Sequence, residues 1–361
     1  MYRRFRRFGS PILSKLKRSA SDWIHSPFMY NPRLMLRSVS LIGIFLLAVA
    51  LAGAQAQAVS TANLSAPPIT GTPSQNELLW QKLDATIQQV NRGLDGTMGV
   101  AIMDLTDGRS LLLNPDAVFT QASSIKVAVL AELYHQQQQS DQGSAGKARL
   151  TDLYTVSADD LVADSFIMTG LTPGVTRVTN RDLATFMVAV SDNSATNVLI
   201  DRVGMDNVNS MLNSLGLTHT RLQRKMMDVK AAQAGRENLS TPREMMTLLA
   251  DLYQRKLLTK PLTDDFFKVL STPKPSDIPR NIPDDVVVAN KPGKLAGVRN
   301  DVGIVFVPNR PFVIVVMTAY LKHEHDGNDA IARIAGAAYD YFDRVGRSSE
   351  YGRIINERNS H

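Results

Sequence analysis

The stretch 121-QASSIKVAVLAEL-133 carries the strongest signal for the fold. From Ile125 to Leu133 almost every residue is apolar, so a helix from residue 123 to about 136 has no polar face. A helix of that kind belongs in the interior of a protein. Ser123 and Lys126 are three positions apart at its start and therefore become neighbours on the helix surface. The stretch predicts a buried helix that begins with a Ser-x-x-Lys element.

Strand patterns lie on both sides of this helix along the chain. They occur at residues 100–105, 110–113, 286–290, 302–307 and 312–318, and the Asp107-Gly108 turn joins the first two. Helical patterns occur at 77–92, 180–190, 193–203, 205–215, 241–256 and 326–344. This order predicts a two-lobe α+β fold: an antiparallel sheet of about five strands, packed by the terminal helices, with an inserted all-helical lobe at roughly 123–258. The cleft between the lobes is the expected place for a site.

The positive charge of the chain is concentrated at one end. The whole chain has a net charge of +6, and residues 1–37 alone contribute +8, so the remainder is close to neutral. A protein that binds nucleic acid needs a basic face on its folded part, so nucleic acid is not the expected partner. The chain has no cysteine, which excludes disulfides and thiol chemistry.

The basic segment is explained better as part of an export signal. An apolar run at residues 41–54 follows it, and the small-x-small sites Ala54-Gln55-Ala56 and Ala56-Gln57-Ala58 come next. We expect a periplasmic or extracellular protein, or one tethered to the membrane if the signal stays uncleaved. The start residue, Met1, Met29 or Met35, is left open. The predicted segments are a basic flank and signal at 1–58, a tether at 59–76, a folded domain at 77–345 and a polar tail at 346–361.

Taken alone, Ser-x-x-Lys is a weak motif, because Ser14–Lys17 and Ser271–Lys274 also match it. Only Ser123 stands at the start of a predicted buried helix; Ser14 lies in the export segment and Ser271 in a proline-rich loop. A serine hydroxyl becomes a nucleophile when a base takes its proton. A lysine can be that base when burial or a second cation lowers its pKa. The alternative is a helix-capping serine with a lysine nearby by chance.

A second polar element, Ser191-Asp192-Asn193, lies between two predicted helices of the helical lobe. Ser191 is suited to relay a proton toward a leaving amine, and Asn193 is suited to hold a substrate amide. The same residues are also common in helix caps and turns. The triplet indicates a catalytic site only in combination with the Ser-x-x-Lys element.

A third element, Lys291-Pro292-Gly293, is expected to end the strand at 286–290. A lysine beside the cleft can supply a fixed charge for a substrate carboxylate, and it would lower the pKa of Lys126 by repulsion. Gly293 allows a substrate to approach the backbone closely. The alternative is a simple turn at the end of a strand.

The order S-x-x-K, S-D-N and K-P-G resembles the signature of class A β-lactamases and penicillin-binding proteins. The stretches QASSIKVAVLAEL, VAVSDNSATNVLIDRVG and NKPGKLAGVRNDVGIVFVP extend the resemblance over most of residues 77–345. The catalytic roles that it implies are nucleophile for Ser123, base for Lys126, proton relay and substrate positioning for Ser191 and Asn193, and carboxylate-binding cation for Lys291.

The same resemblance implies an oxyanion hole formed by the backbone N–H groups of Ser123 and Lys294. Gly293 is expected to border the substrate, and Arg299 either anchors an anionic substrate or pairs with Asp301. The implied substrate is a β-lactam or a cell-wall peptide. A monomer is expected, and neither a cofactor nor a metal ion is implied.

The sequence departs from the family pattern at two places. The glutamate that directs water at the acyl-enzyme in the β-lactamases is replaced by Met226, and the asparagine four residues beyond it by Lys230. Asp228 is the nearest carboxylate. The middle residue of the K-T-G element is Pro292, so a hydroxyl and a backbone N–H that bind the substrate carboxylate are missing.

Three functions follow from these observations. The first is a β-lactamase that hydrolyses its substrate through an acyl-serine, with Asp228 or an unusual water in deacylation. The second is a peptidase or esterase of the penicillin-binding kind, which β-lactams acylate but which deacylates slowly. The third is a binding protein without turnover. The intact polar elements oppose the third, and membership of the family favours the first.

Overall fold

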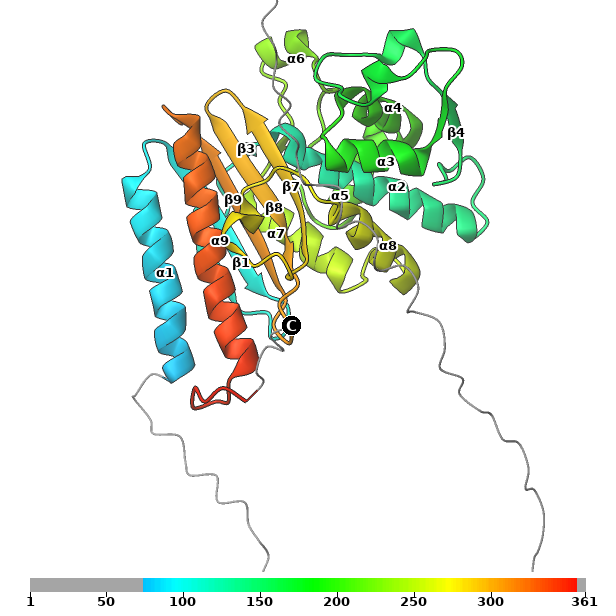
Figure 1. Ribbon diagram of the computed structural model, residues 1–361. Coiled ribbons are helices and arrows are strands. Elements are labelled where there is room, and N and C mark those ends of the chain that lie inside the picture. The colour runs from blue at the N-terminus through cyan, green and yellow to red at the C-terminus, as the bar shows by residue number, and fades with distance from the viewer. Residues whose placement is uncertain (1–73, 356–361) are drawn as a thin grey trace, which may run out of the picture. The chain divides into compact units, whose positions relative to one another are not determined.

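The computed structural model describes residues 74–355, which Figure 1 shows in colour. The predicted export segment 1–58, nearly all of the tether at 59–76 and the end of the polar tail lie outside these residues. No helix within residues 74–355 has the length and apolar character that crossing a membrane requires. The described part contains both predicted lobes.

The first lobe is built on a five-stranded antiparallel sheet with the strand order β2-β1-β9-β8-β7. Its strands are β1 (Thr97–Asp104), β2 (Ser110–Leu113), β7 (Val288–Leu295), β8 (Val298–Val305) and β9 (Phe312–Ala319). Strands from the two ends of the sequence meet at its centre, where β1 pairs with β9 along its full length. The predicted class and sheet are confirmed.

Two long amphipathic helices, α1 (Gln75–Gly93) and α9 (Glu324–Arg347), cover one face of this sheet (Figure 1). Trp80 of α1 packs edge-on against Tyr341 of α9, with 5.1 Å between ring centroids. Phe342 of α9 stacks on Phe312 of β9 at 4.3 Å. These aromatic contacts join both helices to the sheet in a single apolar core.

The second lobe is helical, and α2 lies at its centre. Its elements are η1 (Ala122–Ile125), α2 (Lys126–Asp141), η2 (Ala158–Asp160), η3 (Met168–Gly170), α3 (Asn180–Ala189), α4 (Asn193–Val203), α5 (Met205–Ser214), α6 (Val229–Gln233) and α8 (Lys260–Leu270). Helix α7 (Pro242–Tyr253) packs instead against β1, β8 and β9, on the face of the sheet that α1 and α9 leave open. Two short strand pairs join β3 (Phe119–Thr120) to β6 (Leu239–Ser240) and β4 (Leu153–Thr155) to β5 (Arg177–Thr179). Helices α3, α4, α5 and α8 surround α2, so its apolar residues are buried on every side, as the sequence predicts.

Helix α8 was not predicted, and it extends the helical lobe beyond residue 258. The sequence does carry a start signal there, with Thr259 at the N-cap position and Pro261 in the first turn. Phe266 and Leu270 form part of its buried face, and α8 packs against both α2 and β7. Helix α8 ends at Leu270, and the loop that follows it contains the short helix η4 (Ile278–Asn281).

Strand β7 does not end at Asn290, as the sequence suggested, but runs through Pro292 and Gly293 to Leu295. β7 is an edge strand, where the missing N–H of a proline is tolerated because there is no neighbour on the outer side. At Gly293 the strand touches η1: an added Cβ atom would lie 2.5 Å from the backbone oxygen of Gln121. The absence of a side chain at this residue lets the sheet and the helical lobe meet.

We therefore expect Gly293→Ala to lower the free energy of unfolding by about 1–3 kcal/mol, because backbone atoms must move to admit the methyl group. Urea denaturation followed by circular dichroism measures this change. Gly93→Ala is the control, since no atom lies within 4 Å of the added methyl group. Equal stability of the two variants would contradict the proposed close contact.

Candidate active site

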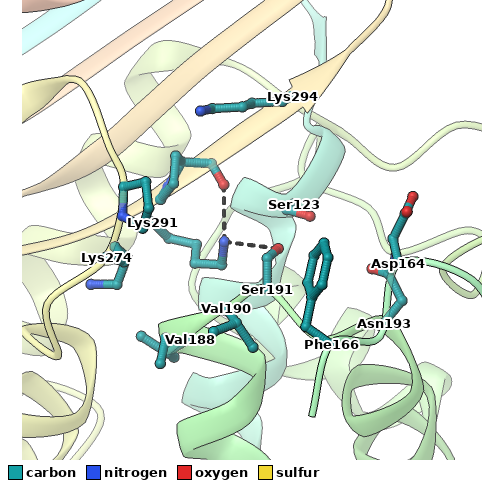
Figure 2. Close-up of a pocket in the computed structure, with 13 residues that line it drawn as sticks. Ser123, Asp164, Phe166, Val188, Val190, Ser191, Asn193, Lys274, Lys291 and Lys294 are labelled. Atoms are coloured by element: carbon teal, nitrogen blue, oxygen red, sulfur yellow. Dashed lines mark hydrogen bonds between the residues drawn. The ribbon is translucent and has the colours of Figure 1, made fainter. Parts of the chain in front are cut away.

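A pocket of about 450 Å³ lies between β7 and the helical lobe (Figure 2). Its lining comes from the start of the buried helix, from the helical lobe and from the sheet edge. The lining residues are Ser123, Asp164, Phe166, Val188, Ala189, Val190, Ser191, Asn193, Lys274, Pro275, Lys291, Pro292 and Lys294. The three predicted polar elements, which are far apart in the sequence, thus meet at one cavity.

Ser123 lies in η1, a tight 3₁₀ turn, rather than in the first turn of a regular α-helix. Ala122, directly before it, has a φ of 47°, in the left-handed region that non-glycine residues rarely adopt. Ser124 is buried, and its hydroxyl donates to the backbone oxygen of Gln121 at 2.6 Å. Ser123 is directed into the pocket, and no side chain caps either η1 or α2. A capping role for Ser123 is therefore excluded.

Lys126 begins α2 one turn after Ser123 and is fully buried. Its Nζ donates to the backbone oxygen of Ser191 at 2.7 Å, to the Oγ of Ser191 at 3.0 Å and to the Oδ1 of Asn193 at 2.9 Å. It forms no ion pair within residues 74–355. Burial, followed by repulsion from Lys291, holds the pKa of Lys126 well below its ordinary value, against the opposing attraction of Asp192. Burial therefore favours the neutral amine of Lys126, the form that can accept a proton.

Ser191 lies in the turn between α3 and α4, and its φ of 58° is again left-handed. The buried carboxylate of Asp192 fixes this turn, because Oδ1 accepts from the N–H of Ala195 at 3.0 Å and Oδ2 from those of Ile167 and Met168 at 2.9 Å. The strained conformation is thus held by a network of buried hydrogen bonds.

The hydroxyl of Ser191 accepts hydrogen bonds from two lysines, Lys126 at 3.0 Å and Lys291 at 3.1 Å. Both lone pairs of its oxygen are then in use, so its own proton is free to point elsewhere. Figure 2 shows the hydroxyls of Ser191 and Ser123 directed into the same part of the pocket. Ser191 is therefore placed to pass a proton between the buried lysines and a bound molecule.

Lys291 projects from β7 and is 1% exposed. Besides its bond to Ser191, its Nζ donates to the backbone oxygen of Pro292 at 3.0 Å. Burial and then repulsion from Lys274 lower the pKa of Lys291 to about 7, and Asp301 partly opposes this. The charge of Lys291 is therefore sensitive to any anion that enters the pocket.

Three further sequence expectations concern residues at the rim. Ser123 and Lys294, whose N–H groups were expected to form an oxyanion hole, both line the pocket, and Gly293 holds their two elements in contact. Arg299 does not line the pocket. Its guanidinium pairs with Glu324 of α9 and donates to the backbone oxygen of Leu295 at 2.8 Å.

The alternative pairing of Arg299 with Asp301 was also wrong. Asp301 is buried, and its Oδ2 accepts from the backbone N–H groups of Asp277 and Ile278 at 3.0 Å. Its Oδ1 accepts from Asn290 at 2.8 Å. Burial raises the pKa of Asp301 to about 6. This carboxylate therefore fastens the loop before η4 to the sheet instead of neutralising a surface arginine.

The loop in which a deacylating carboxylate was expected is closed by Asn197. The Oδ1 of Asn197 accepts from the N–H of Met226 at 2.7 Å, and its Nδ2 donates to the oxygen of Met226 at 3.1 Å. Asp228 is exposed, caps α6 through the N–H of Ala231 at 2.9 Å and does not line the pocket. The only carboxylate among the lining residues is Asp164.

The lining residues that sequence reasoning missed include Asp164, Phe166 and Lys274. Phe166 is 76% exposed at the mouth of the pocket, an unusual place for a large aromatic side chain that only the structure reveals. Lys274 belongs to the second Ser-x-x-Lys match, which was set aside because of its proline-rich surroundings. No three His, Cys, Asp or Glu side chains within residues 74–355 are arranged to hold a metal ion.

A serine beside a buried, unpaired lysine, with a second lysine behind a shared hydroxyl, is the arrangement of enzymes that work through an acyl-serine. A profile of the Beta-lactamase enzyme family matches residues 81–342, and the chain belongs to this family.

Individual relatives agree with this assignment. A β-lactamase of Amycolatopsis lactamdurans is 30% identical over 254 residues, which cover 68% of this chain and 79% of that protein. The crystal structure of a β-lactamase from Sphaerobacter thermophilus is 30% identical, with a TM-score of 0.64, and covers 72% of this chain and 96% of that chain. An acyl-enzyme complex of a PBP-A variant with penicillin G is 25% identical, with a TM-score of 0.65, covering 73% and 97%.

The electrostatic coupling of the two buried lysines can be tested through Ser123. Replacing Lys291 by Met removes the charge that, after burial, does most to lower the pKa of Lys126. That pKa then rises, so the neutral base appears only at higher pH. We expect the acid limb of the pH profile for labelling of Ser123 by an uncharged fluorophosphonate to move to higher pH.

The control for this shift is Lys268→Met, which removes an exposed lysine of α8 outside the pocket lining. Its profile should match that of the unchanged protein. An acid limb in Lys291→Met that stays in place or moves to lower pH would show that the two lysines are not coupled.

Proposed function

We propose that the protein is a serine β-lactamase that opens the amide of a β-lactam through an acyl intermediate on Ser123. The observation that carries this proposal is the state of Lys126, which is fully buried, has no counter-ion within residues 74–355 and lies one turn from Ser123. The relatives named β-lactamases in the comparison support the choice of substrate.

Acylation begins with the proton of the Ser123 hydroxyl, which moves to the neutral amine of Lys126 as the serine oxygen bonds to the carbonyl carbon. Negative charge then develops on the carbonyl oxygen. The N–H groups of Ser123 and Lys294 lie on the two elements that Gly293 brings together, and we assign them to that oxygen.

Ring opening breaks the bond between the carbonyl carbon and the ring nitrogen. The nitrogen needs a proton, and the ammonium of Lys126 now holds the one taken from Ser123. Ser191 accepts a hydrogen bond from Lys126 and is free to donate, so it can pass a proton to the nitrogen and be reprotonated by the lysine. Lys126 returns to its neutral state, and Ser123 carries an ester.

Deacylation completes the cycle when water attacks this ester, releasing the ring-opened acid and restoring the hydroxyl of Ser123. The step requires a base near the ester. The loop residue Met226 has no carboxylate, and Asp228 is engaged as a helix cap. The bases that remain in or beside the pocket are Lys126 and Asp164, the one carboxylate among the lining residues.

This shortage of carboxylates supports a second candidate function. A peptidase or esterase of the penicillin-binding kind would be acylated by β-lactams but would release the product slowly. Its natural substrate would be a cell-wall peptide with a terminal carboxylate, for which Lys291 supplies the charge. The two functions share every step up to the acyl-enzyme.

The decisive experiment follows ring opening of an excess of a chromogenic cephalosporin by the purified protein. We expect continued turnover, which Ser123→Ala abolishes, together with an adduct on Ser123 seen by mass spectrometry in a quenched sample. A burst of about one equivalent without further turnover would favour the peptidase, and no adduct on Ser123 would refute both.

The missing base can be supplied by mutation. Met226→Glu places a carboxylate on a loop whose backbone Asn197 already holds, and we expect it to accelerate hydrolysis of the acyl-enzyme at least tenfold. Burying the new group should lower the free energy of unfolding by about 1–3 kcal/mol. Met226→Gln is the matched control, because it has nearly the same shape and no basic carboxylate. Equal acceleration by both variants would exclude general-base action.

The place of action is also part of the proposal. The apolar run at residues 41–54 and the small-x-small sites after it support export to the periplasm or beyond, with resistance to β-lactam antibiotics as the resulting phenotype. Fractionation of cells that produce the full chain, with a β-lactam-binding fluorophore as the readout, tests this assignment. Label confined to the cytoplasm would contradict it.

A further inference from the structure

Three lysines gather at the sheet side of the pocket: Lys274, Lys291 and Lys294 (Figure 2). None of them forms an ion pair with any residue of the range 74–355. The only acidic lining residue, Asp164, comes from the helical lobe, and Figure 2 shows it on the opposite side of the cavity. Three lysines and no carboxylate therefore line this side of the pocket.

Specific hydrogen bonds hold the side chain of Lys274 and the loop that carries it. Its Nζ donates to the backbone oxygen of Leu270, at the end of α8, at 2.8 Å. Three residues later the loop is fastened to the sheet, because Asp301 accepts from the N–H groups of Asp277 and Ile278. The lysine is half-buried, and this burial lowers its pKa to about 8. The ammonium is thus held beside Lys291 from both ends of the loop.

The nearby buried carboxylate of Asp301 attracts both lysines and partly opposes the lowering of their pKa values, but it forms no ion pair with either of them. Both oxygens of Asp301 are occupied, Oδ2 by two backbone N–H groups and Oδ1 by the side chain of Asn290. An ammonium has three donors. Lys291 uses two of them, on Ser191 and on the oxygen of Pro292, and Lys274 uses one. Three donors from the two lysines remain for a ligand.

At Pro292, beside Lys291, the pocket lacks a hydrogen-bond donor for a substrate carboxylate. Pro292 stands between Lys291 and Gly293 and offers neither a hydroxyl nor a backbone N–H, and its oxygen already accepts from Lys291. A carboxylate bound at β7 therefore needs another donor. Lys274 and Lys294 both line the pocket, and of the two Lys274 has the larger effect on the pKa of Lys291.

We propose that Lys274 and Lys291 form a two-cation site for the carboxylate of the substrate, in which Lys274 replaces the donor that Pro292 cannot supply. Lys274 is then a substrate-binding residue that determines specificity for anionic substrates. This inference rests on the proposed function, since it concerns the substrate of the same pocket. A charge-assisted hydrogen bond of this kind changes affinity about tenfold or more.

The test compares two substrates that differ only in this charge: a chromogenic cephalosporin with its free carboxylate and the methyl ester of that compound. The rate of acylation, as kcat/KM, is measured for the unchanged protein and for the variants Lys274→Met, Lys274→Arg and Lys268→Met. We expect Lys274→Met to lower the ratio of acid to ester rates about tenfold, mainly through KM for the acid. Lys274→Arg should restore most of the ratio, and Lys268→Met should leave it unchanged.

The outcomes separate this inference from the proposed function. If neither substrate acylates Ser123 in the unchanged protein, the proposed function fails. If acylation occurs but Lys274→Met slows acid and ester equally, Lys274 serves only to shape the loop and the inference is overturned. An unchanged ratio also overturns it. Thermal unfolding shows whether each variant is folded. If Lys274→Met has lost its fold, the acid-to-ester ratio of Lys274→Arg is compared with that of the unchanged protein instead.

Discussion

The active site depends on the burial of two lysines that share one acceptor, the hydroxyl of Ser191. Removing an ammonium group from water is costly, and neither Lys126 nor Lys291 recovers that cost through an ion pair within the described residues. The cost lowers the pKa values of both lysines. The surrounding structure must hold the lysines in place against their repulsion, which is the task of α2, of the turn at Asp192 and of β7.

Those three supports explain the division of the fold into two lobes. Ser123 and Lys126 come from η1 and from the start of α2, at the centre of the helical lobe, whereas Lys291 comes from the edge of the sheet. The lobes can approach closely enough because Gly293 has no side chain to separate β7 from η1. Aromatic packing of α1 and α9 on the far face keeps the sheet itself rigid. Two of the residues with a left-handed backbone, Ala122 and Ser191, lie within the site itself.

Much of this arrangement could be predicted from the sequence because its signals are local. The unbroken apolar run after Lys126 requires burial, and the order of strands and helices requires an antiparallel sheet with an inserted lobe. The remaining features depend on tertiary contacts. The loop of Lys274 is fastened by Asp301 of β8, and the guanidinium of Arg299 pairs with Glu324 of α9. Nothing in the sequence around either residue specifies the partner.

The outer edge of β7 has a consequence for assembly and for peptide docking. An unpaired strand edge normally offers alternating donors and acceptors on which a second strand can grow. At Pro292 this edge has no donor, and the oxygen of the same residue already accepts from Lys291. A chain that added itself to β7 would therefore lose its ladder bonds at this residue. Pro292, which removes a contact to the substrate, therefore also disfavours the pairing of a strand from another protein with β7 beside the pocket.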